Sequence, residues 1–156
     1  MSDELIRRME KQGRIRKQEV GLVQIEALLR QAIVDLEEAK KVSHIAERAT
    51  YLLAYMAMLK AGRALLLLNG YAPADGGQHR TVVEITSALL GKRYQSLTDH
   101  FETMRRKRNE MTYEAGGLLS MSEGQEAFRN AVSLVDEILK IAKSRNPQLE
   151  LELGID

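Results

Sequence analysis

The sequence predicts an all-α protein with a single domain, built as a bundle of four to five helices. Apolar residues recur at helical spacing along most of the chain, and alternating strand patterns are nearly absent. Only two prolines occur, Pro73 and Pro147. The length of 156 residues lies within the range of one ordinary domain with a real hydrophobic core.

The first predicted helix covers residues 18–41 and follows a basic N-terminal lead, residues 1–17, which we expect to be mobile. Its apolar residues form one stripe, as in a helix that buries one face against a core. Glu26 and Arg30 stand four residues apart on the other side, where opposite charges attract each other across one helical turn.

The second predicted helix is the most apolar, so we expect it at the centre of the core. Ser43 can cap its first turn, and Asn69-Gly70 is a good C-terminal stop. The loop that follows is rich in turn-forming residues and leads to a short helix, roughly residues 79–90.

Two further helices complete the predicted bundle. One begins near Ser96 or Thr98 and ends at the glycine pair 116–117. The other begins at Ser122, because the spacing of this serine to Gln125 suits a capping box.

The predicted bundle therefore spans residues 18–145 and leaves an acidic tail, residues 146–156. Apolar and charged residues alternate in this tail. The pattern fits an edge strand, a partner-binding arm or a frayed end, and the sequence leaves these alternatives open.

Composition excludes several classes of protein. The absence of cysteine excludes disulfides, zinc–thiolate sites and cysteine nucleophiles, and it suits a reducing compartment. No phosphate-binding loop, dinucleotide motif or metal-type histidine pairing is visible, so we expect no cofactor and no metal. The apolar run 51–68 is interrupted by Lys60 and Arg63, which favours a buried bundle helix over a membrane span. We expect a cytoplasmic protein that does not enter a membrane.

The most distinctive stretch is "MRRKRNEMTYEAGG", residues 104–117. Between Lys92 and Arg108 the chain carries six lysines and arginines against two acidic residues, a local excess of about four positive charges in a protein of net charge +1. Such clustering can attract phosphate, although basic helix faces are common and usually only face solvent.

Helical spacing groups the polar residues of this stretch into one sector, flanked by Arg108: Arg105, Asn109, Thr112 and Tyr113. Guanidinium, amide and phenol groups together can recognise a phosphate or the edge of a base. The alternative is that Tyr113 is an ordinary packing residue of an amphipathic helix.

The chain resembles the HEPN superfamily, whose name stands for higher eukaryotes and prokaryotes nucleotide-binding. Three features carry the resemblance, which covers residues 20–143. They are the helical bundle, the helix "AYMAMLKAGRALLLLNGY" followed by a loop with Gly77 and His79, and "RRKRNEMTYEAG" in a late helix.

The resemblance implies a function class and a set of site residues. Many members are metal-independent endoribonucleases of toxin–antitoxin or defence systems, and many dimerise so that two motifs share one cleft. Their motif is an arginine, often followed by a polar residue, and then a histidine. Here Arg108 matches the arginine and Asn109 the polar residue, but Tyr113 stands at the histidine position.

This departure weakens the ribonuclease hypothesis more than the binding hypothesis. Imidazole titrates near neutral pH, whereas a phenol is mostly protonated there and is a poor base unless cations such as Arg105 and Arg108 lower its pKa. Of the three histidines, His79 is the best candidate to face the site from another element. For His44 and His100 we expect capping, surface or half-buried roles.

We therefore expect a HEPN-like module that binds RNA or nucleotides in a stress, toxin–antitoxin or defence system. We expect it to form a homodimer, with an antitoxin-like protein as a further partner. A catalytically inactive module for dimerisation or protein interaction is the alternative, and an active ribonuclease that uses Arg108 and Tyr113 is the third. The binding residues predicted for the first hypothesis are Arg105, Arg108, Asn109, Tyr113 and His79.

Overall fold

The computed structural model describes residues 2–74, 78–113 and 119–155, and it confirms the all-α class. The described residues form six α-helices, a short 3-10 helix and one small two-stranded sheet. In chain order the elements are α1 (Ser2–Lys11), β1 (Ile15–Lys17), α2 (Leu22–Val42), α3 (Glu47–Leu68), β2 (Tyr71–Pro73), α4 (Gln78–Leu90), η1 (Lys92–Tyr94), α5 (Gln95–Tyr113) and α6 (Met121–Arg145).

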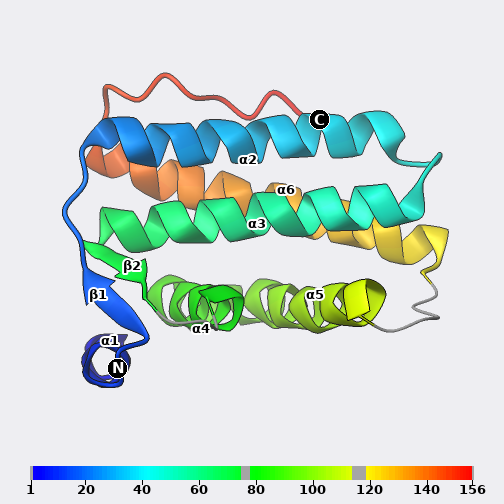
Figure 1. The fold of residues 1–156 in the computed structure, drawn as a ribbon. Coiled ribbons are helices and arrows are strands. Elements are labelled where there is room, and N and C mark those ends of the chain that lie inside the picture. Colours follow the sequence, from blue (N-terminus) through cyan, green and yellow to red (C-terminus); the bar gives the residue numbers. More distant parts are fainter. Residues whose placement is uncertain (1, 75–77, 114–118, 156) are drawn as a thin grey trace.

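Helix α3 lies at the centre of the bundle, as its apolar sequence predicts. It packs against α2 and α6 on one side and against α4 and α5 on the other (Figure 1). Twelve of its residues are buried, and they lie on several faces of the helix because neighbours surround it. The predicted pair of Arg30 with Glu26 also forms on α2, at 2.8 Å.

The expected role of Ser43 is wrong. This residue ends α2 rather than beginning α3: its backbone N–H donates to the carbonyl of Ala39 at 2.9 Å, and its hydroxyl donates to that of Lys40 at 2.7 Å. His44 follows with a φ of +73°, a left-handed conformation that turns the chain and stops the helix. Helix α3 therefore starts only after Ala46.

The capping box of the last helix is also shifted by two residues from the prediction. Ser120 accepts a hydrogen bond from the backbone N–H of Glu123 at 3.1 Å, and the Glu123 carboxylate accepts one from the backbone N–H of Ser120 at 3.1 Å. A carboxylate is a stronger acceptor than the amide of Gln125. The Gln125 amide instead donates to Nδ1 of His44 at 2.7 Å and so ties α6 to the α2–α3 turn.

The N-terminal lead forms α1 and β1, two elements that the sequence pattern did not indicate. Strand β1 pairs with β2 in antiparallel register, with Ile15 opposite Pro73. Met9 and Ile15 are buried in a small apolar cluster together with Leu66 of α3 and Ile85 of α4. The lead thus packs beside the end of the bundle where α3 ends and α4 passes (Figure 1).

The acidic tail runs as an extended chain alongside α2 (Figure 1). Leu149 and Leu151 are buried in the main core, whereas Glu150 and Glu152 between and after them are exposed. Within the described part of the chain, the tail is not a strand, and no tail carboxylate pairs with a cation of α5. The alternation seen in the sequence therefore corresponds to leucines that enter the core between solvated carboxylates.

By length and composition alone, α3 could cross a membrane, but 61% of its most apolar window is buried inside the protein. Lys60, one of the two cations that interrupt the apolar run, forms an ion pair with Asp35 of α2 at 2.7 Å. These features are those of a core helix. The cytoplasmic location stays a prediction.

Helices α3 and α4 approach each other closely at Gly62. A Cβ atom at this position would lie 2.7 Å from Cγ1 of Val82 and 2.8 Å from Oγ1 of Thr86. Both neighbours belong to α4 and are buried, so neither can move aside without disturbing the core. The missing side chain of Gly62 therefore sets how near α4 can come to α3.

We expect the Gly62→Ala substitution to lower the free energy of unfolding by about 1 kcal/mol. Overpacking costs about 1–3 kcal/mol, and the better helix propensity of alanine offsets about 1 kcal/mol of it. Chemical denaturation followed by circular dichroism would measure the change. Gly154→Ala is the control, because nothing lies within 4 Å of the added Cβ there. An unfolding midpoint of Gly62→Ala at or above that of the unchanged protein would contradict the expectation.

Candidate functional site

The cations predicted to act together on α5 fall into two groups. Arg105 forms a bidentate pair with Glu102, with Nε 2.6 Å and Nη2 3.0 Å from the two carboxylate oxygens. Arg106 shares the same carboxylate at 3.1 Å. The hydrogen bond from Arg105 is the main reason that the pKa of Glu102 lies below its usual value. Glu102 therefore compensates part of the charge of this helix.

Arg108 has no such compensation. Its Nη1 donates to Oδ1 of the neighbouring Asn109 at 3.4 Å, and its side chain is half-buried. Among the residues that the structure describes, no carboxylate lies within 4.0 Å of its guanidinium. Asn109 thus supports Arg108 with a neutral contact and leaves the positive charge available to a ligand.

Tyr113 and Thr112 also belong to the polar sector predicted on α5. Tyr113 is the last residue of α5, and its side chain lies outside the described part of the structure, as does the predicted stop at Gly116-Gly117. Thr112 is exposed, and its hydroxyl donates to the carbonyl of Arg108 at 2.8 Å. The assignment of Tyr113 therefore stays a prediction from the sequence.

His79 lies in the first turn of α4 and contacts a buried tyrosine that sequence reasoning missed. Tyr55 of α3 is 0% exposed, and its hydroxyl lies 2.9 Å from Nδ1 of His79. The two rings are 5.7 Å apart, and Phe101 of α5 flanks Tyr55 on another side, with ring centroids 5.9 Å apart. A signal did exist, because a phenol within the most apolar helix of a protein needs a polar partner.

Arg63 of α3 is the second residue that sequence reasoning missed, since it served only to argue against a membrane span. Its Nη2 donates to Oε1 of Gln78, the residue before His79, at 3.2 Å. Its Nε is sealed from solvent and has no hydrogen-bond partner. As with Arg108, no carboxylate of the described residues lies within 4.0 Å of it.

The charges of Arg63, Arg105 and Arg108 influence the pKa values of both His79 and Tyr55. Burial lowers the pKa of His79, and the charges of Arg108, Arg63 and Arg105 lower it further, in that order. Burial raises the pKa of Tyr55, although the same three arginines oppose this rise. His79 is therefore neutral and Tyr55 protonated at pH 7.

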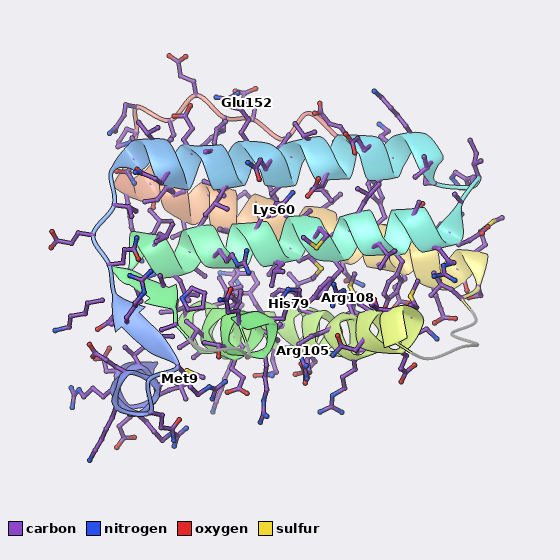
Figure 2. The ribbon with its side chains drawn as sticks, in the orientation of Figure 1. Met9, Lys60, His79, Arg105, Arg108 and Glu152 are labelled. Carbon is purple, nitrogen blue, oxygen red and sulfur yellow. The ribbon has the colours of Figure 1, made fainter. Side chains whose placement is uncertain are left out.

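We call this set the basic cluster: Tyr55, Arg63, His79, Arg105 and Arg108. It draws on α3, α4 and α5, and Figure 2 shows His79 and Arg108 near each other where these helices meet. The structure thus brings together three of the predicted residues, Arg105, Arg108 and His79. The cluster offers N–H donors and positive charge, which suits an anion.

The other two histidines take part in different contacts. His44 accepts the hydrogen bond from Gln125, and His100 lies with Nε2 3.3 Å from the Glu126 carboxylate. Nδ1 of His100 is sealed and has no partner. Burial lowers the pKa of His100, and Glu126 acts in the opposite direction. Among the described residues, no group of three or more acidic or histidine side chains could hold a metal ion.

Comparison with known families gives one result. The model of the HEPN domain matches residues 25–145, which is most of the chain and includes the whole basic cluster. The comparisons with curated proteins and with solved structures found no match.

We expect the free energy of unfolding to fall as the pH decreases below about 6.5, the usual pKa of histidine. His79 and His100 have lowered pKa values in the folded chain, so the unfolded chain takes up protons first. The stability that these two histidines contribute is fully present above pH 6.5, and it is lost as the pH falls toward their pKa values in the folded chain. Denaturant titrations between about pH 7 and about pH 5 would measure this slope.

The control for this measurement is the double substitution His79→Gln and His100→Gln, which removes both titrating groups. We expect it to flatten the dependence on pH, whatever it does to the absolute stability. A slope equal to that of the unchanged protein would contradict the assignment of the two histidines.

Proposed function

Because the chain belongs to the HEPN family, we propose that it binds RNA or nucleotides and that the basic cluster holds their phosphate. One observation carries the proposal. Arg63 and Arg108 come from two different helices, and the positive charge of each lowers the pKa of His79. Neither arginine has a carboxylate within 4.0 Å among the described residues.

Phosphate suits this arrangement for a physical reason. Two half-buried guanidiniums without an acidic partner repel each other and are poorly hydrated, so an anion between them gains attraction from both. Arginine also presents parallel N–H groups that match the oxygens of a phosphate. Arg105 adds positive potential, although Glu102 compensates part of it.

The remaining predicted residues extend the site along α5. Asn109 keeps its amide N–H groups for a base edge or a second phosphate while its oxygen accepts from Arg108. In the proposal Tyr113, one turn further, stacks on a base or donates its hydroxyl. A stress, toxin–antitoxin or defence context and an antitoxin-like partner follow from the family resemblance alone.

We expect Arg108→Ala or Arg63→Ala to weaken binding of a short fluorescein-labelled single-stranded RNA about tenfold, because each removes a charge-assisted contact. Fluorescence anisotropy at several salt concentrations would measure it. The dependence of log affinity on log salt should fall by about one unit for each lost phosphate contact. Arg129→Ala, which removes an exposed arginine of α6 outside the basic cluster, is the matched control and should bind like the unchanged protein.

Unchanged affinity and salt dependence in both cluster variants would contradict the proposal, as would the absence of RNA binding at low salt by the unchanged protein. The double substitution of Arg108 and Tyr113 by alanine extends the test to the end of α5. Incubating the same samples with RNA and a chelator tests the ribonuclease alternative, for which cleavage must depend on Arg108.

A groove on α2 and α3 favours dimerisation as a second role. It measures about 510 Å³ and includes Val23 and Val34, which are 78% and 43% exposed. The ion pairs of Arg30 with Glu26 and of Lys60 with Asp35 also line it. Since both pairs close within one chain, a second copy can cover the groove about a twofold axis and leave no charge unpaired.

We expect the unchanged protein to have a dimeric mass at micromolar concentration and Val34→Glu to have a monomeric one, because a carboxylate would be buried in the interface. Light scattering coupled to gel filtration measures both. Ile45→Glu places the same charge on another exposed apolar residue, 78% exposed and outside the groove, and should remain dimeric. A monomeric mass for the unchanged protein would exclude this role.

A further inference from the structure

The contact between Tyr55 and His79 decides which nitrogen of the imidazole carries its proton. The Tyr55 hydroxyl is buried, and Nδ1 of His79, 2.9 Å away, is its only hydrogen-bond partner among the described residues. A buried O–H group without an acceptor costs folding free energy, whereas Nδ1 can accept only when it carries no proton. The phenol therefore donates, and Nδ1 accepts.

The second nitrogen must then hold the proton of the neutral ring. Nε2 has no hydrogen-bond partner among the described residues, and it is not one of the side-chain atoms sealed from solvent. The reverse tautomer would need Nδ1–H to donate to the phenol oxygen, which would leave the phenol proton without an acceptor inside the core. A doubly protonated ring is opposed by burial and by the charges of Arg108, Arg63 and Arg105.

We propose that Tyr55 is a positioning residue that fixes His79 as the Nε2–H tautomer, so that His79 donates a hydrogen bond to the phosphate held by Arg63 and Arg108. This inference rests on the proposed function, because phosphate is the ligand proposed there. The ligand class is a phosphate oxyanion, because such oxygens only accept hydrogen bonds, whereas the arginines and the Nε2–H group of His79 only donate them.

The Nε2–H tautomer limits the chemistry that His79 can perform at the site. A histidine can act as a general base only through a nitrogen with a free lone pair. In His79 the Nδ1 lone pair is occupied by the Tyr55 hydroxyl, and Nε2 carries the proton. His79 thus replaces the motif histidine as a donor that orients phosphate and not as a group that removes a proton.

The tautomer is tested directly by nuclear magnetic resonance of the full chain with ¹⁵N-labelled histidine near pH 7.5. Long-range ¹H–¹⁵N spectra distinguish a protonated ring nitrogen from an unprotonated one. We expect Nε2 of His79 to be protonated and Nδ1 to be unprotonated, with assignment by the loss of these signals in His79→Gln. In Tyr55→Phe the preference should diminish toward a mixture of tautomers. A protonated Nδ1 in the unchanged protein would overturn the proposal.

The donor role is tested by two substitutions of similar polarity. The amide nitrogen that His79→Gln introduces reaches about as far as Nε2, whereas the shorter amide in His79→Asn reaches only about as far as Nδ1. With the same labelled RNA, we expect His79→Asn to lose about tenfold in affinity and His79→Gln to lose clearly less. Circular dichroism and denaturant midpoints establish that both variants fold.

Different outcomes separate the donor role of His79 from RNA binding by the arginines. If His79→Gln loses as much affinity as His79→Asn while both are folded, the donor role is overturned and RNA binding by the arginines stands. If the unchanged protein binds no RNA at low salt, the proposed function fails and the phosphate role of His79 fails with it. The ring-nitrogen spectra then still decide the part played by Tyr55.

Discussion

The close approach of α4 to α3 at Gly62 sets the geometry on which the basic cluster depends. Since Gly62 has no side chain, Val82 and Thr86 occupy the space that its Cβ would fill. The first turn of α4 then lies near enough to α3 for His79 to reach the Tyr55 hydroxyl at 2.9 Å. This hydrogen bond matters to folding as well, because a phenol buried without a partner costs about 1–3 kcal/mol.

The distribution of charge follows from the same packing. The chain is nearly neutral, with a net charge of +1, yet its cations are not equivalent. Glu102 pairs with Arg105 and Arg106 on α5. Arg108 and Arg63 both lower the pKa of His79, and among the described residues neither has a carboxylate within 4.0 Å. Half-buried cations without an acidic partner work against folding. Features that oppose stability in this way are expected at functional sites, where a ligand supplies the missing charge.

The cluster also changes the meaning of the departure from the HEPN motif. In the alignment expected from the resemblance, Tyr113 stands at the histidine position of that motif, so α5 would supply no imidazole there. The imidazole near Arg108 comes instead from His79 of α4, with Nδ1 engaged by Tyr55. In the proposed function, the site therefore keeps the means to hold and orient phosphate, and it lacks a histidine placed to remove a proton.

Much of the fold could be predicted from the sequence, because helical periodicity and the stops between helices are local properties. The all-α class, the central place of the most apolar helix and the pair of Glu26 with Arg30 follow from neighbours within one or two turns. The first residue of each helix was harder to predict, because serine can cap either end of a helix. The left-handed turn at His44 places Ser43 at the end of α2, and the acceptor strength of Glu123 selects Ser120 as the cap of α6.

The sequence by itself determined that a run of cations, an amide and a phenol would share one late helix. Only the tertiary structure decided which of these cations are compensated, and that Tyr55 and Arg63 belong with them. The physical reason is distance along the chain: Tyr55 and His79 are 24 residues apart, and their contact depends on how α3 and α4 are rotated and spaced. The spacing depends on the close packing at Gly62, which no local pattern encodes.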